Sequence, residues 1–244
     1  VDVGGTTVKM GYFDIEGNLI EKWEIPTRTE DKGVNIIPDI AGSILVKLAQ
    51  KDIDKKEVVG VGIGVPGPVK EDGTVLVAVN LGWDKRNTNE ELEDLLGIPV
   101  KTANDANVAA LGEMWRGGGQ GYDDVVAVTL GTGVGGGVII GGKVIAGSNG
   151  AGGEIGHIHL EDNESEECGC KGHGCLEQYA SATGIVRMAK EDLTNDSVLA
   201  SCENITAKDV FVGAKAGDRY CREIVERFGR YLGIALSNVA HVVD

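Results

Sequence analysis

Three of the chain's five cysteines fall within eight residues, at Cys168, Cys170 and Cys175, and His157 precedes them. Thiolates and an imidazole are the ligands that tetrahedral zinc prefers in proteins, so this spacing predicts a zinc-bound knot in the chain. The alternative is an ordinary packed histidine and three small buried thiols, but clustering among glycines favours the metal. Glu154 and Glu177 bracket the knot and are expected to bind a substrate.

Composition excludes several classes of protein. The net charge of −15 works against a nucleic-acid surface, which needs clustered Lys and Arg. The sequence has no apolar run near the roughly 20 residues that cross a bilayer, and no charged-then-apolar leader. We therefore expect a cytoplasmic protein with no membrane or nucleic-acid partner. An odd cysteine count fits a reducing compartment, with Cys202 and Cys221 as single thiols on helices.

The hydrophobic pattern alternates between strands and helices. Strands are predicted at residues 1–3, 8–13, 18–25, 58–65, 98–102, 125–130 and 134–140. Helices are predicted at 34–50, 88–97, 104–115 and 219–242, the last capped by Asp218. The triple glycine 117–119 marks a boundary, so we expect two α/β lobes, residues 1–116 and 117–244. The charged runs 52–57 and 161–167 are predicted to be solvated and to have no specific role.

Two glycine turns, each between two strands, have the composition of phosphate cradles. The first is Asp2-Val3-Gly4-Gly5-Thr6-Thr7-Val8-Lys9 and the second is Gly131-Thr132-Gly133. Such turns offer backbone N–H groups and hydroxyls to phosphate, and Asp2 could hold a metal through water. Either turn alone could be an ordinary tight hairpin, in which glycine only supplies the backbone conformation. The presence of two such turns favours a nucleotide-binding site. Neither turn has the Walker or the dinucleotide-binding pattern.

Asn104 and Asp105 stand where a predicted strand ends and a helix begins, and side chains there project into a cleft at a sheet's carboxyl edge. One of the two can cap the helix, while Asp105 could accept a proton from a hydroxyl group. Together with Glu154, His157 and Glu177 they would form a polar ring suited to a sugar.

The sequence resembles the ROK family, bacterial sugar kinases and related repressors with the two-lobed actin-like ATPase fold, in which nucleotide and sugar bind in a cleft between the lobes. The resemblance covers essentially the whole chain. Its signature is carried by Leu130, Gly133, Gly135, Gly137, Val138, Gly147, Gly153, Gly156 and His157.

This resemblance implies a role for each candidate residue. Asp105 would be the catalytic base of phosphoryl transfer from Mg-ATP to a sugar 6-hydroxyl. The sugar would be bound by Gly67, Asn104, Asp105, Glu154, His157 and Glu177. The ATP phosphates would lie near Asp2, Gly4, Gly5, Thr6, Thr7, Lys9, Thr132 and Gly133. Structural zinc would be bound by His157, Cys168, Cys170 and Cys175, with the second ring nitrogen of His157 facing the sugar.

Residues 148–157 and 180–184 are similar to the family's glucose kinases, so glucose is the expected substrate. Kinases for N-acetylmannosamine, N-acetylglucosamine or fructose share the same polar ring and remain alternatives. A sugar-sensing transcriptional regulator and a non-catalytic sugar-binding domain are further alternatives, and the latter would predict that Asp105 is replaced. The resemblance also implies a homodimer. We expect the chain to lack the start of the first strand and an adenine-binding segment after the last helix.

Overall fold

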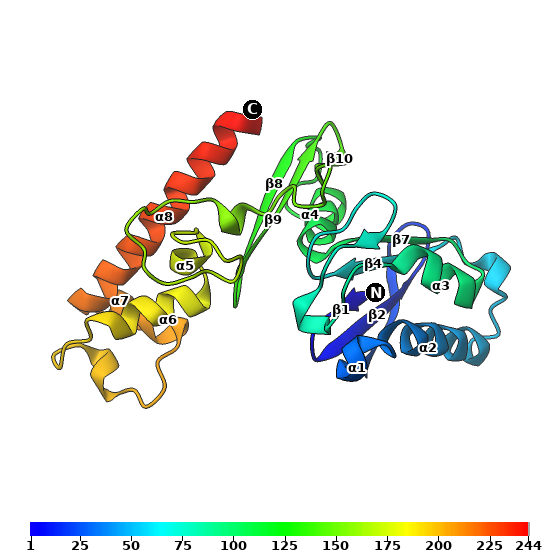
Figure 1. Cartoon of the computed structure of the whole chain (residues 1–244), viewed down its shortest axis with the longest axis horizontal. Helices are drawn as coiled ribbons and strands as arrows, with labels where there is room; N and C mark the ends of the chain where they lie inside the picture. Colours follow the sequence, from blue (N-terminus) through cyan, green and yellow to red (C-terminus); the bar gives the residue numbers. More distant parts are fainter. Residues whose placement is uncertain (244) are drawn as a thin grey trace. The chain divides into compact units, whose positions relative to one another are not determined.

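The computed structural model describes residues 1–243, which divide into two compact units (Figure 1). The first unit comprises Val1–Val125 and Gly141–Gly152, and the second comprises Val126–Ile140 and Gly153–Asp244. In the described part of the chain, no helix combines the length and the apolar character that crossing a bilayer requires.

The first unit is built on a mixed five-stranded sheet. Its strands are β1 (Asp2–Val3), β2 (Thr7–Phe13), β3 (Leu19–Pro26), β4 (Val61–Val65) and β7 (Val100–Asn104), in the order β3-β2-β1-β4-β7. Strands β1, β4 and β7 run parallel, whereas β2 and β3 are antiparallel to their neighbours. Because β1, β4 and β7 are parallel, their carboxyl ends meet at one edge of the sheet.

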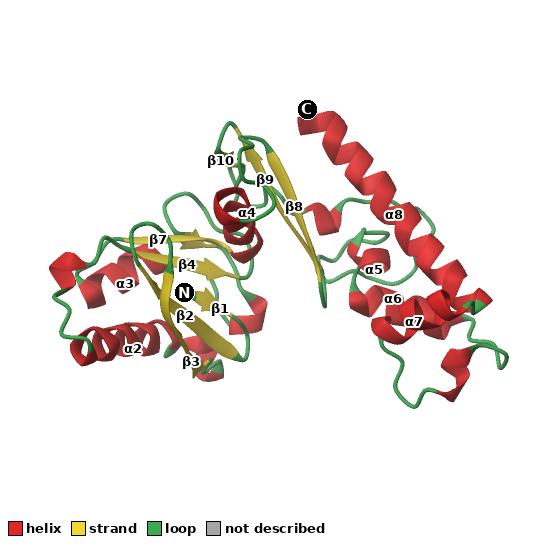
Figure 2. Ribbon diagram, turned by 180° about the vertical axis from the view of Figure 1, so that it is seen from behind, coloured by secondary structure: helices red, strands yellow, loops and turns green. Residues whose placement is uncertain are grey.

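Helices cover this sheet and bury its apolar side chains. They are α1 (Glu30–Gly33), α2 (Ile36–Gln50), α3 (Thr88–Leu96) and α4 (Asp105–Arg116). Helices α2 and α3 lie side by side, and α4 packs on β4 and β7 (Figures 1 and 2). The core joins side chains of the helices and the sheet, including Val3, Val8, Ile36, Ile37, Ile40, Ile63, Val65, Leu92 and Leu96.

Smaller elements complete the first unit. They are the β-strands β5 (Thr74–Val75), β6 (Arg86–Asn87) and β10 (Lys143–Val144), and the 3-10 helices η1 (Lys55–Glu57) and η2 (Val79–Leu81). Trp83 is 2 % exposed and donates its indole N–H to Gly33 O, as expected for a packing residue. Trp115 is 55 % exposed and lines an apolar groove of about 1020 Å³ with Phe13 and Tyr122.

The second unit combines a hairpin with a helical layer. Strands β8 (Val125–Leu130, which starts in the first unit) and β9 (Val134–Ile140) are hydrogen-bonded neighbours joined by Gly131-Thr132-Gly133. The helices are η3 (Ile155–His157), α5 (Glu177–Ala180), α6 (Ala182–Glu191), η4 (Val198–Ser201), α7 (Ala207–Ala216) and α8 (Arg219–Val243). Figure 2 shows α5, α6, α7 and α8 gathered together, and their core includes Leu176, Tyr179, Met188, Val210 and Ile224.

Side-chain caps mark the start of several helices. Asn87 caps α3 by accepting a hydrogen bond from Glu90 N, and Gly97 ends that helix in the left-handed conformation. Asp218 accepts from Cys221 N at the start of α8, as predicted. The prediction that Cys202 lies on a helix was wrong, because η4 ends at Ser201 and Cys202 has extended backbone.

Candidate functional site

The carboxyl ends of the parallel strands carry three of the candidate segments. Gly4 follows β1, Gly67 lies in the loop after β4, and Asp105 follows β7. Val65 of β4 pairs with Asn104 of β7, which brings the last two segments side by side. This register places the candidate residues of the first unit at one edge of the sheet, where ligands of α/β sheets bind.

Asn104 connects two of these segments. Its Oδ1 accepts a hydrogen bond from Asn107 N at 3.1 Å, which caps α4, and its Nδ2 donates to Gly67 O at 3.1 Å. Gly67 has a φ of +90°, and a Cβ there would lie 2.3 Å from Val77 O. Only glycine therefore fits this loop, and the buried amide of Asn104 fixes it.

Asp105 stands in the first turn of α4, and because Asn104 caps the helix, Asp105 is left for other chemistry. One carboxylate oxygen accepts a hydrogen bond from Ala106 N at 2.8 Å. Burial raises the pKa of Asp105 above its ordinary 3.8, the hydrogen bond from Ala106 opposes this, and the nearby charge of Asp2 raises the pKa further. A carboxylate with a raised pKa is a better proton acceptor than an ordinary aspartate.

The first glycine turn links β1 to β2. Gly4 N donates to Thr7 O at 3.0 Å, and Thr27 contacts the turn through two hydrogen bonds, from its N to Thr6 O at 2.9 Å and from its hydroxyl to Gly4 O at 2.6 Å. Asp2 and Lys9 pair across β1 and β2 and are both exposed. Asp2 lies close enough to Asp105 to influence its pKa, so a cation bound there would relieve repulsion between two carboxylates.

The second glycine turn is joined to Glu177. Gly131 N donates to Gly133 O at 3.0 Å, and Val134 N donates to Glu177 Oε2 at 2.9 Å. A Cβ at residue 133 would lie 2.4 Å from that same carboxylate oxygen, so a larger residue there would displace the Glu177 carboxylate from this position. The Glu177 side chain thus lies directly against the Thr132-Gly133 turn.

His157, Cys168, Cys170 and Cys175 come together in the second unit, and their ligand atoms all lie within 4.8 Å of one another. His157 Nδ1 lies 3.7 Å from Cys168 Sγ, and Cys170 Sγ lies 3.6 Å from Cys175 Sγ. Tetrahedral zinc with ordinary bond lengths would separate such ligand atoms by about 3.6 to 3.8 Å. The two distances match that range, and the other ligand atoms lie within 4.8 Å, so the number, chemistry and grouping of the four side chains fit a zinc site.

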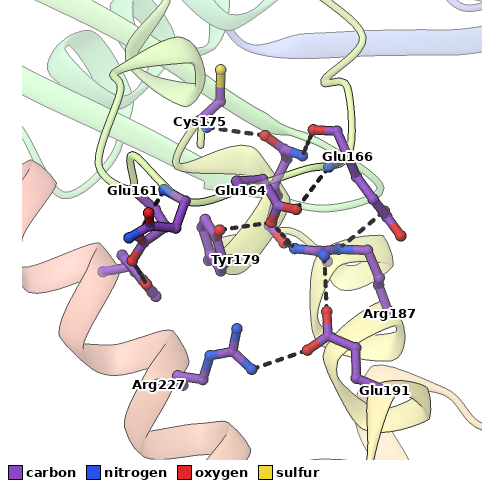
Figure 3. Close-up of polar contacts among 12 residues, drawn as sticks. Glu161, Glu164, Glu166, Cys175, Tyr179, Arg187, Glu191 and Arg227 are labelled. Carbon is purple, nitrogen blue, oxygen red and sulfur yellow. Dashed lines mark hydrogen bonds and ion pairs between the residues drawn. The ribbon is translucent and has the colours of Figure 1, made fainter. Parts of the chain in front are cut away.

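The loop that carries Cys168, Cys170 and Cys175 is held in place by hydrogen bonds and ion pairs of polar side chains (Figure 3). Gln178 accepts a hydrogen bond from Cys175 N and donates to Glu166 O, which ties both ends of the loop to α5. Glu164 accepts from Tyr179 and from Arg187, and only 7 % of its side chain is exposed. Burial alone would raise the pKa of Glu164, but these partners together lower it.

The prediction that residues 161–167 are solvated and without a specific role was therefore wrong for Glu161 and Glu164, whereas residues 162, 163 and 165–167 are exposed as predicted. Glu161 accepts a hydrogen bond from Tyr231, and Glu164 is buried in an ion pair with Arg187. These partners come from α5, α6 and α8, which lie far along the chain from the run of charges. Charge patterning alone does not reveal them.

The whole chain is similar to known proteins. Residues 1–244 match the ROK family over their full length. The chain belongs to the ROK family. A glucokinase of Halalkalibacterium halodurans is 43 % identical over 251 residues, which cover all of this chain and 76 % of that protein. The predicted family is confirmed.

Two solved ROK structures resemble the chain. The ROK hexokinase of Thermus thermophilus has a TM-score of 0.80 at 31 % identity, over 99 % of this chain and 76 % of that one. The ROK glucokinase of Streptomyces griseus, in complex with glucose and AMPPNP, has a TM-score of 0.74 at 36 % identity, over 100 % of this chain and 78 % of that one. The predicted fold class, the α/β actin-like ATPase fold of ROK sugar kinases, is confirmed by these likenesses.

The two units hold different parts of the candidate set. The first unit contains the Asp2–Lys9 turn, Gly67, Asn104 and Asp105. Gly67 O accepts a hydrogen bond from the Asn104 side chain. The second holds the Thr132-Gly133 turn, Glu154, the four metal-type ligands and Glu177. Glu154 immediately precedes η3 and accepts a hydrogen bond from His157 N at 3.1 Å through its carbonyl.

Sequence reasoning passed over three polar residues that the structure places beside these segments. Asn107 Oδ1 is buried without a hydrogen-bond partner in the described part of the chain, two residues after Asp105. Thr27 contacts the first glycine turn, and Thr183 donates its hydroxyl to Thr132 O in the second. Asn107 could have been found from its place in the Asn104-Asp105-Ala106-Asn107 segment, whereas the threonines lie far along the chain from the turns.

Proposed function

We propose that this ROK protein transfers the γ-phosphoryl group of ATP to the 6-hydroxyl of glucose, giving glucose 6-phosphate and ADP. The observation that carries this proposal is the 43 % identity to a glucokinase across the entire chain. Two features agree with it: a carboxylate of raised pKa at a sheet's carboxyl edge, and two glycine turns between strands. The product would feed glycolysis in the cytoplasm.

In this mechanism Asp105 is the base. The proton of the 6-hydroxyl passes to Asp105 as the sugar oxygen forms a bond to the γ-phosphorus, and the bond from that phosphorus to the β,γ-bridging oxygen breaks to release ADP. The Ala106 N–H donates to one carboxylate oxygen of Asp105, and in the proposed mechanism the other oxygen takes the proton of the hydroxyl. Positioning of the two reactants supplies much of the rate.

Two sets of residues bind the reactants. Glucose is bound by Gly67, Asn104, Asp105, Glu154, His157 and Glu177. The ATP phosphates are bound by the turn that includes Asp2, Gly4, Gly5, Thr6, Thr7 and Lys9, and by Thr132 and Gly133. Mg²⁺, held near Asp2, would neutralise charge that builds up on the phosphates. We expect the protein to act as a homodimer.

Zinc has a structural role in this proposal. The cluster of His157, Cys168, Cys170 and Cys175 would hold it, and His157 Nδ1 is the ring nitrogen that faces the thiols. With Nδ1 on the metal, Nε2 is presented to a sugar hydroxyl in a fixed tautomer. Zinc bound there would fix the orientation of His157 toward the sugar, and its role would be structural rather than Lewis-acid catalysis.

The test is an assay of ADP release with Mg-ATP and a panel of glucose, mannose, fructose, N-acetylglucosamine and N-acetylmannosamine. We expect kcat/KM for glucose to exceed that for each N-acetyl sugar at least tenfold, because one misplaced group in a polar pocket costs on the order of 1.4 kcal/mol or more. Turnover with an N-acetyl sugar alone would overturn the proposed substrate and keep the mechanism. Binding of glucose without ADP release would favour a sugar-sensing regulator.

A further inference from the structure

The first glycine turn is held from one side by a single threonine. The hydroxyl of Thr27 donates to Gly4 O at 2.6 Å, and its backbone N donates to Thr6 O at 2.9 Å. The peptides of the described chain are trans, so a carbonyl and the N–H of the next residue point in opposite directions. Fixing Gly4 O toward Thr27 therefore directs the Gly5 N–H away from Thr27.

The second turn is held in the same way by the start of α6. Ala182 N donates to Gly131 O at 2.8 Å, and the Thr183 hydroxyl donates to Thr132 O at 2.7 Å. These bonds direct the N–H groups of Thr132 and Gly133 away from α6. Neither N–H has an acceptor within the described part of the chain, so both are available to an anion.

The proton positions around Thr183 follow from the partners. Thr132 O can only accept, so Thr183 is the donor in that bond and must accept from Ser181, whose Oγ lies 2.9 Å away. Ser181 Oγ in turn accepts from Gly184 N and is 1 % exposed. Hydrogen bonds therefore run in one direction from Gly184 N through the Ser181 and Thr183 hydroxyls to Thr132 O. Each hydrogen bond in such a series polarises and strengthens the next.

We propose that Thr27 and Thr183 are positioning residues that hold both glycine turns with their N–H groups toward the ATP phosphates. This inference rests on the proposed kinase function. Without the hydroxyl, the peptide of Gly4 or Thr132 can rotate and present a carbonyl oxygen instead of an N–H group. A carbonyl repels phosphate, so one lost hydrogen bond replaces an attraction with a repulsion.

The experiment compares Thr27→Val and Thr183→Val, which remove the hydroxyl and keep the branched shape, with Thr27→Ser and Thr183→Ser, which retain it. Ser201→Ala is the matched control, because Ser201 also donates its hydroxyl to a backbone carbonyl, that of Val198. The measurements are KM for Mg-ATP, KM for glucose, kcat and Tm.

We expect each valine variant to raise KM for Mg-ATP about fivefold, the value of one modest hydrogen bond, with KM for glucose changed less than about twofold. The serine variants and Ser201→Ala should keep both KM values within about twofold of wild type. An unchanged KM for Mg-ATP in the valine variants would overturn the proposal. So would an equal rise in both KM values, or a serine variant as impaired as the valine variant.

Failure of the proposed kinase function can be distinguished from failure of the positioning role. If the wild type releases no ADP with any sugar, titration of a fluorescent ATP analogue still compares the same variants. Weaker binding by about fivefold in both valine variants supports the positioning role, and equal binding in all variants overturns it.

Discussion

Asp105→Asn is expected to lower kcat with glucose by about 10³-fold, in the range that loss of a general base costs. Asparagine can still accept the hydrogen bond from Ala106 N, so the local backbone should keep its conformation. It can also hydrogen-bond a sugar hydroxyl, so the Kd for glucose should change less than about threefold. Steady-state kinetics and calorimetric titration with glucose give the two readouts.

The same substitution should not lower Tm at pH 7. The pKa of Asp105 is raised in the folded state, so its contribution to stability is complete below the ordinary value of 3.8 and is lost as pH rises through the raised pKa. Removing the charge therefore stabilises the fold at neutral pH and has no such effect at acid pH. Loss of activity together with an equal or higher Tm would separate catalysis from folding.

Asp218→Asn is the matched control, since Asp218 also stands at a helix start and accepts a backbone N–H, from Cys221. Hydrogen bonds lower the pKa of Asp218 rather than raise it, and asparagine can still cap the helix. This variant should retain wild-type kcat. Full activity of Asp105→Asn would contradict the assignment of Asp105 as the base.

Cys175→Ser is expected to abolish zinc binding and to lower Tm by about 10 °C or more. Loss of a structural metal belongs to the few changes that cost more than about 4 kcal/mol, and each kcal/mol shifts Tm by roughly 2 to 4 °C in a protein of this size. Wild-type protein should contain one zinc ion per chain by elemental analysis. Because His157 would lose its orientation, kcat/KM for glucose should also fall, by about 10- to 100-fold.

Cys202→Ser controls for the loss of a thiol, because Cys202 is partly exposed and lies outside the cluster of ligand-type side chains. It should retain zinc and lower Tm by no more than about 2 °C. Zinc content of zero in the wild type, or an unchanged zinc content in Cys175→Ser, would contradict the assignment of these four side chains as ligands.

The sequence predicted most of the fold because its local signals agree. Strands β8 and β9 have the predicted bounds, and α8 begins after the predicted cap at Asp218. Both glycine turns lie between strands as expected. Periodicity and capping depend on neighbours in the chain, which a single sequence displays.

Contacts between distant segments were not predictable in this way. Thr27 lies 23 residues from Gly4, and Thr183 lies 51 residues from Thr132. Glu164 belongs to a run of charges that looks solvated, yet its partner Arg187 comes from α6. These pairings depend on how the elements pack, so only the folded structure brings them together.

The most direct test of the proposed reaction is identification of its product. The protein is incubated with Mg-ATP and ¹³C-labelled glucose, and the products are followed by ³¹P and ¹³C nuclear magnetic resonance. We expect ADP and a phosphate monoester in equal amounts, with phosphorus coupled to carbon 6 of glucose. Release of inorganic phosphate alone, a phosphorylated position other than carbon 6, or no phosphorylated sugar while glucose binds would contradict it.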